Sequence, residues 1–175
     1  MLSDEALMAR IADGDEDAFA AFVERHVDRL MAVAARVLGA REAAEDAVQE
    51  AMLQLWRHAG RFDPGRAKAT TWLYRILVNR CLDAKRRQKP AAALDVAGDP
   101  ADPGPGPEAA AVQANDAAIV QAALAALPPR QRAAIALVYY QGLSNREAAA
   151  AMDVNIKALE SLLTRGRAAL RERLQ

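Results

Sequence analysis

The chain has 175 residues, enough for one domain of ordinary size or two small ones. Its 23 basic and 23 acidic residues give a net charge of zero, which taken alone argues against a nucleic-acid-binding protein. A single cysteine, Cys81, excludes an internal disulfide framework.

Other classes are excluded by what the sequence lacks. No apolar run approaches the length of a membrane span, and the acidic N-terminus has no signal-peptide pattern. His26 and His58 are far apart, and no cluster of cysteine and histidine has metal-binding spacing. No nucleophile, base and orienting group occur at a recognisable spacing. We therefore expect a cytoplasmic protein without membrane insertion that is not an enzyme and holds no metal or cofactor.

The charges are nevertheless segregated along the chain. Residues 1–60 hold six basic and twelve acidic side chains, whereas residues 61–89 hold nine and two. Residues 90–127 hold no basic and five acidic side chains, and residues 128–175 hold eight and four. Such alternation carries information that the total hides.

Helix-favouring residues dominate the first half, and glycine and proline divide it into elements. Helices are expected at residues 3–13, 15–39, 41–59 and 70–87, with a Pro-Gly turn in the loop 61–66 before the last of them.

Residues 90–107 contain five prolines and no basic residue, which predicts an acidic, flexible linker. After it, helices are expected at residues 108–126, 128–142, 144–152 and 155–174. Ser144 and Glu147 fit a capping box, and a short helix, a tight turn and a longer helix outline a helix-turn-helix. The predicted fold is therefore all-α, with two small helical domains at residues 1–89 and 108–175.

Helical periodicity separates two faces of the last helix. The packing face is expected to contain Ile156, Leu159, Leu163, Gly166 and Leu170. Opposite it and on its flank lie Lys157, Glu160, Ser161, Thr164, Arg165 and Arg167. Such side chains near a helix N-terminus can read base edges in a major groove. The alternative is the solvated face of a helical bundle, but the helix-turn-helix outline favours DNA.

The helix at 70–87 shows a similar division. Its inward side is expected to hold Leu73, Ile76, Leu77, Cys81 and Ala84, with Cys81 as a core residue. Its outer side and the preceding loop present Arg61, Arg66, Lys68, Trp72, Arg75, Asn79, Leu82, Lys85, Arg86 and Arg87. This pattern fits a nucleic-acid surface with an aromatic beside it or an ordinary basic solvated face equally well. Arg80 interrupts the apolar stripe, so we predict a salt bridge to a carboxylate of the second or third helix.

The helix at 41–59 places a leucine and a tryptophan beside carboxylates on its outer face. This face comprises Asp46, Gln49, Glu50, Leu53 and Trp56. It indicates a protein-binding patch. Scattered surface apolar residues, or packing of Trp56 on the first helix, remain open alternatives.

Several short motifs occur in a characteristic order. They are Gly14-Asp15 with Ala18-Phe19, Ala44-Glu45-Asp46-Ala47-Val48-Gln49-Glu50 leading to Leu55-Trp56, Trp72-Leu73 with Ile76, Asn79, Asp83 and Arg86, the run from Leu124 to Arg132, Gly142-Leu143-Ser144 with Glu147-Ala148-Ala149, and Leu163 with Arg165 and Arg167. In this order and spacing the chain resembles the extracytoplasmic-function (ECF) sigma factors of bacterial RNA polymerase, in the sigma-70 family. The resemblance covers nearly the whole chain outside the linker.

The resemblance implies a role for each surface. The patch on the helix at 41–59 would bind the clamp helices of the polymerase β′ subunit, and the C-terminal domain would meet the β flap. Residues from about Arg61 to Arg87 would recognise the minus-ten promoter element and capture unpaired bases. The last helix would read the minus-thirty-five element. The linker would thread through polymerase, no further C-terminal domain would follow, and an anti-sigma protein would hold the factor inactive until a stress response.

One departure concerns the recognition helix, where the family often has a basic residue on each side of a serine. Here the positions read Glu160-Ser161-Leu162, so base contacts are expected from Lys157, Ser161, Thr164 and Arg165, with Glu160 able to accept from a cytosine amino group. The competing hypothesis is a stand-alone helix-turn-helix regulator whose N-terminal helices bind a ligand or mediate dimerisation.

Overall fold

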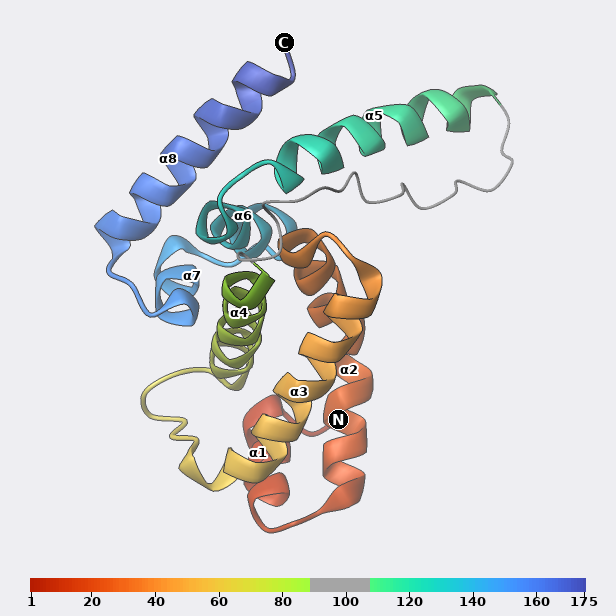
Figure 1. The fold of residues 1–175 in the computed structure, drawn as a ribbon. Coiled ribbons are helices and arrows are strands. Elements are labelled where there is room, and N and C mark those ends of the chain that lie inside the picture. Colours follow the sequence, from red (N-terminus) through yellow and green to blue (C-terminus); the bar gives the residue numbers. More distant parts are fainter. Residues whose placement is uncertain (89–107) are drawn as a thin grey trace.

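The structure, a computed structural model, describes the backbone of residues 1–88 and 108–175 and the side chains of residues 1–88 and 116–175. Within these ranges the chain is almost entirely helical and contains no strand (Figure 1). The predicted all-α fold is therefore confirmed. The predicted linker at 90–107 lies outside the described residues.

The N-terminal unit begins with a hairpin of one short and one long helix. Its elements are α1 (Asp4–Ala12), α2 (Glu16–Leu38), α3 (Arg41–His58), the 3-10 turn η1 (Ala59–Arg61) and α4 (Ala69–Gln88). Ser3 and Asp15 cap α1 and α2 by accepting from Ala6 N–H and Ala18 N–H. Gly39 ends α2 at φ 76°, in the left-handed region that glycine enters without steric cost.

The C-terminal unit is also wholly helical. Its elements are α5 (Glu108–Ala125), α6 (Pro129–Ile135), η2 (Ala136–Tyr140), α7 (Asn145–Met152) and α8 (Ile156–Arg173). Both bonds of the predicted capping box at the start of α7 are present. Asn155 caps α8 by accepting from Ala158 N–H at 2.8 Å. The predicted helix-turn-helix is thus formed by α7 and α8.

One predicted helix differs from the structure. Residues 128–142 were expected to form a single α-helix, but α6 gives way after Ile135 to the π-helical turn η2, in which Gln141 N–H donates to the carbonyl of Ala136. The wider turn leaves the tyrosines at 139 and 140 exposed. Gly142 then ends the segment at φ 69°. Hydrophobic spacing alone does not report such a local change of hydrogen bonding.

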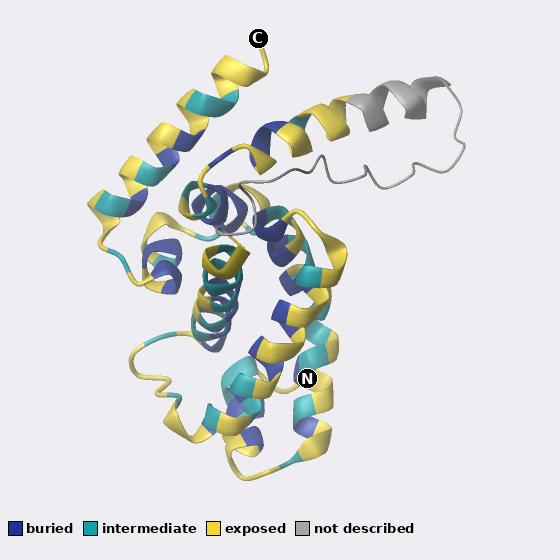
Figure 2. Cartoon of the chain, in the orientation of Figure 1, coloured by how far each residue is buried: buried dark blue, intermediate teal, exposed yellow. Residues whose placement is uncertain are grey.

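The inward stripes follow the predicted periodicity (Figure 2). Phe22, Leu30, Leu55 and Leu77 are fully buried where α2, α3 and α4 meet. Cys81 is equally buried, and burial raises the pKa of its thiol to about 12, as expected for an inert core residue.

Two predictions of side-chain orientation are wrong. Ile156 was expected on the packing face but is 43% exposed, because it is the first residue of α8 and lies more than two turns from the close contact with α6. At that contact, a Cβ on Gly166 would lie 2.7 Å from Ile135 Cδ1. Leu82 was expected on the outer side of α4 but is half-buried, because the C-terminal unit packs there.

The two units pack against each other. The buried apolar side chains of both units belong to one continuous cluster. The helix α7 lies against α4, and the helices α5 and α6 lie against α2 (Figure 1). The Arg36 guanidinium lies 3.9 Å from the centre of the Tyr140 ring, a cation–π contact across the boundary. No pattern in the sequence predicts this association of the two units.

Arg132, in the middle of α6, lies at the boundary between the units and is only 5% exposed. Its guanidinium donates to the carbonyl of Val37 at 2.7 Å, near the end of α2. It also donates to the carbonyls of Ala125, the last residue of α5, and of Leu127, two residues further on. The last carbonyls of a helix have no partner within the helix, and a cation is favourable there. Arg132 therefore joins the ends of two helices from different units.

We predict that Arg132→Met lowers the free energy of unfolding by about 3 kcal/mol, because buried carbonyls lose their donor. Chemical denaturation followed by circular dichroism measures this change. Arg130→Met is the matched control, because Arg130 is exposed on the same helix and should change stability by less than about 0.5 kcal/mol. Equal effects of the two substitutions would contradict the role given to Arg132.

Candidate functional site

A stripe of polar and aromatic side chains runs along α4 away from the N-terminal core. Trp72, Arg75, Asn79 and Arg86 follow one another at spacings of three, four and seven, so they share a face. With the neighbouring predicted residues they form what we call the α4 surface. It comprises Arg61, Arg66, Lys68, Arg75, Asn79, Arg86 and Arg87, which are exposed, and Trp72 and Lys85, which are half-buried. Asn79, Lys85 and Arg86 line the side of α4 that faces the C-terminal unit, whereas Arg87 lies toward α3.

The loop before α4 is fastened at two points. The Phe62 ring packs on Trp72 with centroids 5.6 Å apart. The Glu5 carboxylate, from α1, accepts from the N–H of Ala69 at 3.2 Å, at the first residue of α4. A carboxylate at a helix N-terminus satisfies an N–H that has no partner within the helix. These contacts hold the basic loop residues beside the helix that carries the rest of the surface.

Two cations of the α4 surface pair with the C-terminal unit. Lys68 Nζ lies 2.7 Å from Glu147 Oε1, and Arg75 Nη2 lies 3.3 Å from Asp153 Oδ1. The hydrogen bond from Lys68 and that from the Ser144 N–H lower the pKa of Glu147 to about 2, so this carboxylate is ionised at neutral pH.

Other charged groups of this surface have partners nearby in sequence. Arg66 pairs with Asp63, and Arg86 pairs with Asp83. Burial, and then the charge of Arg132, lower the pKa of Lys85. The surface therefore remains basic overall, although part of its charge is already neutralised by carboxylates of this chain.

The outer face of α8 is exposed as predicted. Its residues are Lys157, Glu160, Ser161, Thr164, Arg165 and Arg167, and all are exposed. On the opposite side Leu159, Leu163 and Gly166 are buried against the rest of the unit. The hydroxyl of Tyr139, from η2, accepts from Arg167 Nη1 at 2.9 Å and holds this arginine against the flank of the helix. The dimensions of an α-helix presenting short polar and basic side chains suit the major groove.

The α3 patch keeps its predicted orientation. It comprises Asp46, Gln49, Glu50 and Leu53, which are exposed, and Trp56, which is half-buried. Leu53 is 44% exposed and lies among the polar side chains of the patch, so it is available for an apolar contact with a partner. Trp56 packs on Phe19 of α2, with ring centroids 5.1 Å apart, so it is anchored at the edge of the patch.

A groove of about 400 Å³ between α3 and the end of α4 adjoins the α3 patch. Its lining includes Glu50, Leu53 and Arg87. Arg80 Nη1 lies 3.8 Å from Glu50 Oε1, which confirms the predicted salt bridge to the third helix. This ion pair holds the acidic and apolar α3 patch beside the basic end of α4.

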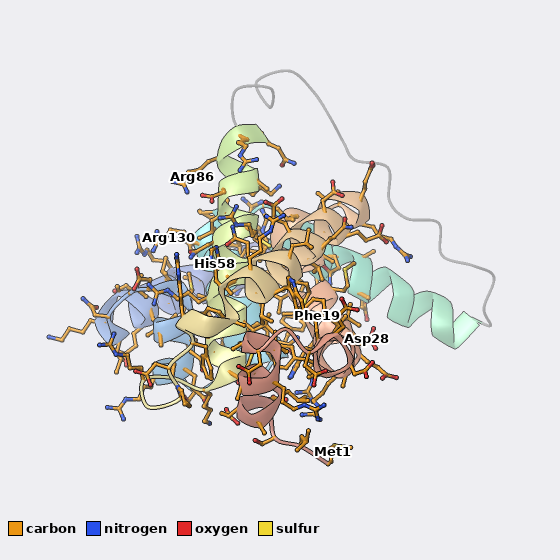
Figure 3. The ribbon with its side chains drawn as sticks, turned by 90° about the horizontal axis from the view of Figure 1, so that it is seen from below. Met1, Phe19, Asp28, His58, Arg86 and Arg130 are labelled. Carbon is orange, nitrogen blue, oxygen red and sulfur yellow. The ribbon has the colours of Figure 1, made fainter. Side chains whose placement is uncertain are left out.

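A larger cleft of about 1270 Å³ lies between α4, the start of α6, the turn that follows α7 and the first half of α8. Asn79 and Arg86 line one side, and Ser161 and Arg165 line the other. Arg86, near the end of α4, and Arg130, on α6, can both be followed in Figure 3. The α4 surface and the α8 face thus meet at one cleft, although they come from different units.

Comparison with known proteins gives these surfaces a context. Residues 22–91 match the family model for Sigma-70 region 2, and residues 117–170 match that for Sigma-70, region 4. The ECF RNA polymerase sigma factor SigW of Bacillus subtilis is 34% identical, over 95% of this chain and 94% of its own length. The chain belongs to the ECF sigma factors.

Solved structures of two sigma factors agree with the assignment of this chain to the family. CnrH in complex with the cytosolic domain of CnrY superposes with a TM-score of 0.71 at 28% identity, covering 98% of this chain and 96% of that one. RpoE in complex with the anti-sigma factor NepR from Bartonella quintana gives 0.69 at 26% identity, covering 89% and 96%.

Some residues that build the sigma factor's surfaces were not predicted. Phe62 could have been found, since it is the aromatic residue of a short basic loop. Glu5 and Tyr139 act through contacts between segments distant in sequence, and no local pattern identifies them.

The part of the chain that the structure describes lacks two further features. Over residues 1–88 and 108–175, no helix is long and apolar enough to cross a membrane. In the part of the chain that the structure describes, no three histidine, cysteine or carboxylate side chains converge as metal ligands.

We predict that Glu5→Ala lowers the free energy of unfolding by about 1 kcal/mol, the usual contribution of a side chain that caps a helix N-terminus. It should also speed hydrogen exchange at the Ala69 amide, measured by NMR, because this N–H loses its acceptor. Glu5→Gln keeps an acceptor oxygen and should restore most of the protection. Unchanged exchange in Glu5→Ala would show that the contact does not hold the start of α4.

Proposed function

We propose that this sigma factor binds core RNA polymerase and confers on it the recognition and opening of promoters. In this proposal it acts in the cytoplasm as a specificity subunit and performs no catalysis itself. Residues 1–89 form the unit that binds polymerase and the minus-ten element, residues 90–107 connect the units, and residues 108–175 form the unit that binds the minus-thirty-five element. Membership of the family along the N-terminal half favours this role over that of a stand-alone regulator.

The observation that carries the proposal is the separation of three exposed surfaces with different chemistry. The α3 patch combines carboxylates with exposed Leu53, as suits a protein partner such as the β′ clamp helices. The α4 surface combines cations with Trp72, as suits unpaired bases and their phosphates. The α8 face presents short polar and basic groups, as suits base edges in a duplex.

Roles within the two DNA surfaces follow from side-chain chemistry. On α4, Trp72 would stack on an unpaired base and Asn79 would hydrogen-bond to one, while the cations hold phosphates. Extruding a base from a duplex costs a few kcal/mol, which these contacts must offset. On α8, Arg165 and Lys157 would contact guanine or phosphate, and Glu160 would accept from a cytosine amino group.

Partners beyond polymerase are also inferred from relatives. CnrH and RpoE were solved with CnrY and with the anti-sigma factor NepR. We propose that an anti-sigma protein likewise binds this chain and controls its access to polymerase. The β flap would receive the C-terminal unit when the factor is released.

The first test uses the α3 patch and in vitro transcription with core polymerase. We expect wild-type protein to direct initiation at specific sites and Leu53→Asp to reduce polymerase binding at least tenfold, because a charge would enter an apolar contact. Its free energy of unfolding should stay within about 0.5 kcal/mol of wild type, since Leu53 is 44% exposed.

Leu174→Asp is the control for that experiment, because Leu174 is equally apolar and 46% exposed but far from the patch. It should bind polymerase and initiate as the wild type does. Failure of the wild-type protein to associate with core polymerase would refute the proposed function. Equal loss in both variants would refute the place of Leu53.

A second test addresses the α8 face on the assembled polymerase complex. We predict that Arg165→Ala costs about 1–3 kcal/mol of promoter affinity and relaxes preference at one position of the minus-thirty-five element. Arg171→Ala, also exposed on α8 but nearer its C-terminus, should have a smaller effect that is the same for all sequences. Unchanged affinity and initiation in Arg165→Ala would exclude base contact by this side chain.

A further inference from the structure

The helix α7 lies beside α4 with one carboxylate near its start and one just after its end. Glu147 meets Lys68 at 2.7 Å, and Asp153 meets Arg75 at 3.3 Å. Lys68 and Arg75 are seven residues apart, about 10 Å along a helix, and the two carboxylates are six residues apart, about 9 Å. Two cations and two anions of separate units are therefore matched in spacing as well as in charge.

Local structure fixes the Glu147 carboxylate and the backbone position of Asp153. Glu147 is the third residue of α7, and its Oε2 accepts from the N–H of Ser144 at 3.0 Å while Oε1 faces Lys68. Asp153 follows α7 at φ 54°, in the left-handed region that asparagine and aspartate tolerate best among residues with a side chain. The capping box thus holds the Glu147 carboxylate toward Lys68, and the backbone N–H of Asp153 caps the end of α7 by donating to the carbonyls of Ala149 and Ala150.

Neighbouring contacts keep α7 and α4 together. The hydroxyl of Tyr74, a buried residue of α4, donates to Gln141 Oε1 at 3.1 Å. Behind it lie the bond from Arg132 to the end of α2 and the packing of Arg36 on Tyr140. The ion pairs therefore form the exposed rim of an interface whose centre is buried.

This arrangement cannot be the one that contacts both promoter elements. Elements near minus ten and minus thirty-five are separated by about 25 base pairs, or roughly 85 Å at 3.4 Å per base pair. The α4 surface and the α8 face instead line a single cleft, with Asn79 and Arg86 on one side and Ser161 and Arg165 on the other. The units must separate before both surfaces can bind one promoter.

We infer that α7 acts as an internal substitute for DNA, with Glu147 and Asp153 occupying on Lys68 and Arg75 the places of promoter phosphates. The inference rests on the proposed role of the α4 surface. Exposed ion pairs contribute little each, so the phosphates of promoter DNA can replace them readily. The docked arrangement then lowers the affinity of the free factor for DNA without preventing its later use.

The test uses conservative variants that keep the fold. Glu147→Gln preserves the capping box, in which glutamine serves as well as glutamate, and Asp153→Asn suits the left-handed position. The double variant removes only the two charges. The matched control is Glu24→Gln with Asp28→Asn, which removes two negative charges from exposed positions of α2.

The probe is a fluorescent single-stranded DNA of mixed sequence at low salt, titrated by anisotropy. We expect Glu147→Gln with Asp153→Asn to bind it about fivefold more tightly than the control pair, in keeping with two exposed ion pairs. An affinity equal to that of the control pair would overturn the inference, because the gain would then reflect net charge alone.

A second measurement reports the docking itself. Fluorescent labels on Asp17→Cys and Glu172→Cys, both at exposed positions, place a donor and an acceptor on the two units. Native Cys81 should react slowly, since it is buried and its thiol pKa is raised. Energy transfer should fall as the DNA binds. Binding without any change in transfer would overturn the inference, since DNA and α7 would then occupy α4 together.

Different results would refute the proposed function and the inference about α7. If wild-type protein does not associate with core polymerase, the sigma role is lost whatever the labels report. If it directs initiation while energy transfer and DNA affinity behave as in the overturning outcomes, the sigma role stands and the internal substitute does not.

Discussion

The guanidinium of Arg132 lies where the helices α2 and α5 end, and its hydrogen bonds determine how the rest is assembled. The carbonyls of Ala125 and Leu127 orient the corner between α5 and α6, while the carbonyl of Val37 ties that corner to the end of α2. Burial lowers the pKa of this arginine, but the carbonyls of the helix ends stabilise its charge. Once α6 is fixed on α2, the short connections that follow bring α7 to α4 and set α8 beyond it. A single buried cation therefore relates the surfaces of both units.

The zero net charge acquires a different meaning in this structure. It arises because basic and acidic segments complement each other within one molecule, as where Glu147 and Asp153 of the second unit face Lys68 and Arg75 of the first. Phosphate affinity grows with the number of cations free to bind, so internal pairing keeps free DNA binding weak. Polymerase association and DNA binding can then be coupled through one change of arrangement.

Much of the architecture was predictable, because the helices are amphipathic, well capped and separated by glycine or proline. The inward stripe of α3, the capping box at Ser144 and the partner of Arg80 all depend on positions close in sequence or on a charge that must be neutralised. The π-helical turn and the exposure of Ile156 were missed, because neither alters hydrophobic spacing. Docking of the units was also missed, since it depends on carbonyl groups at helix ends that every sequence possesses. The predicted site residues lie on the surfaces expected of them, but their contacts with DNA and polymerase remain predictions.

One face of α8 packs against the rest of its unit, and the opposite face is exposed and makes no core contacts. Leu159, Leu163 and Gly166 bind the helix to its unit, whereas Glu160, Ser161 and Thr164 are exposed and contribute nothing to the core. Substitutions at such positions usually change stability by less than about 0.5 kcal/mol. Duplicated copies of a gene for this protein could therefore diverge in the DNA they read without passing through unstable intermediates. Glu160 and Ser161 are compatible with that freedom because both are exposed, whereas Leu162 is half-buried and packs against the core.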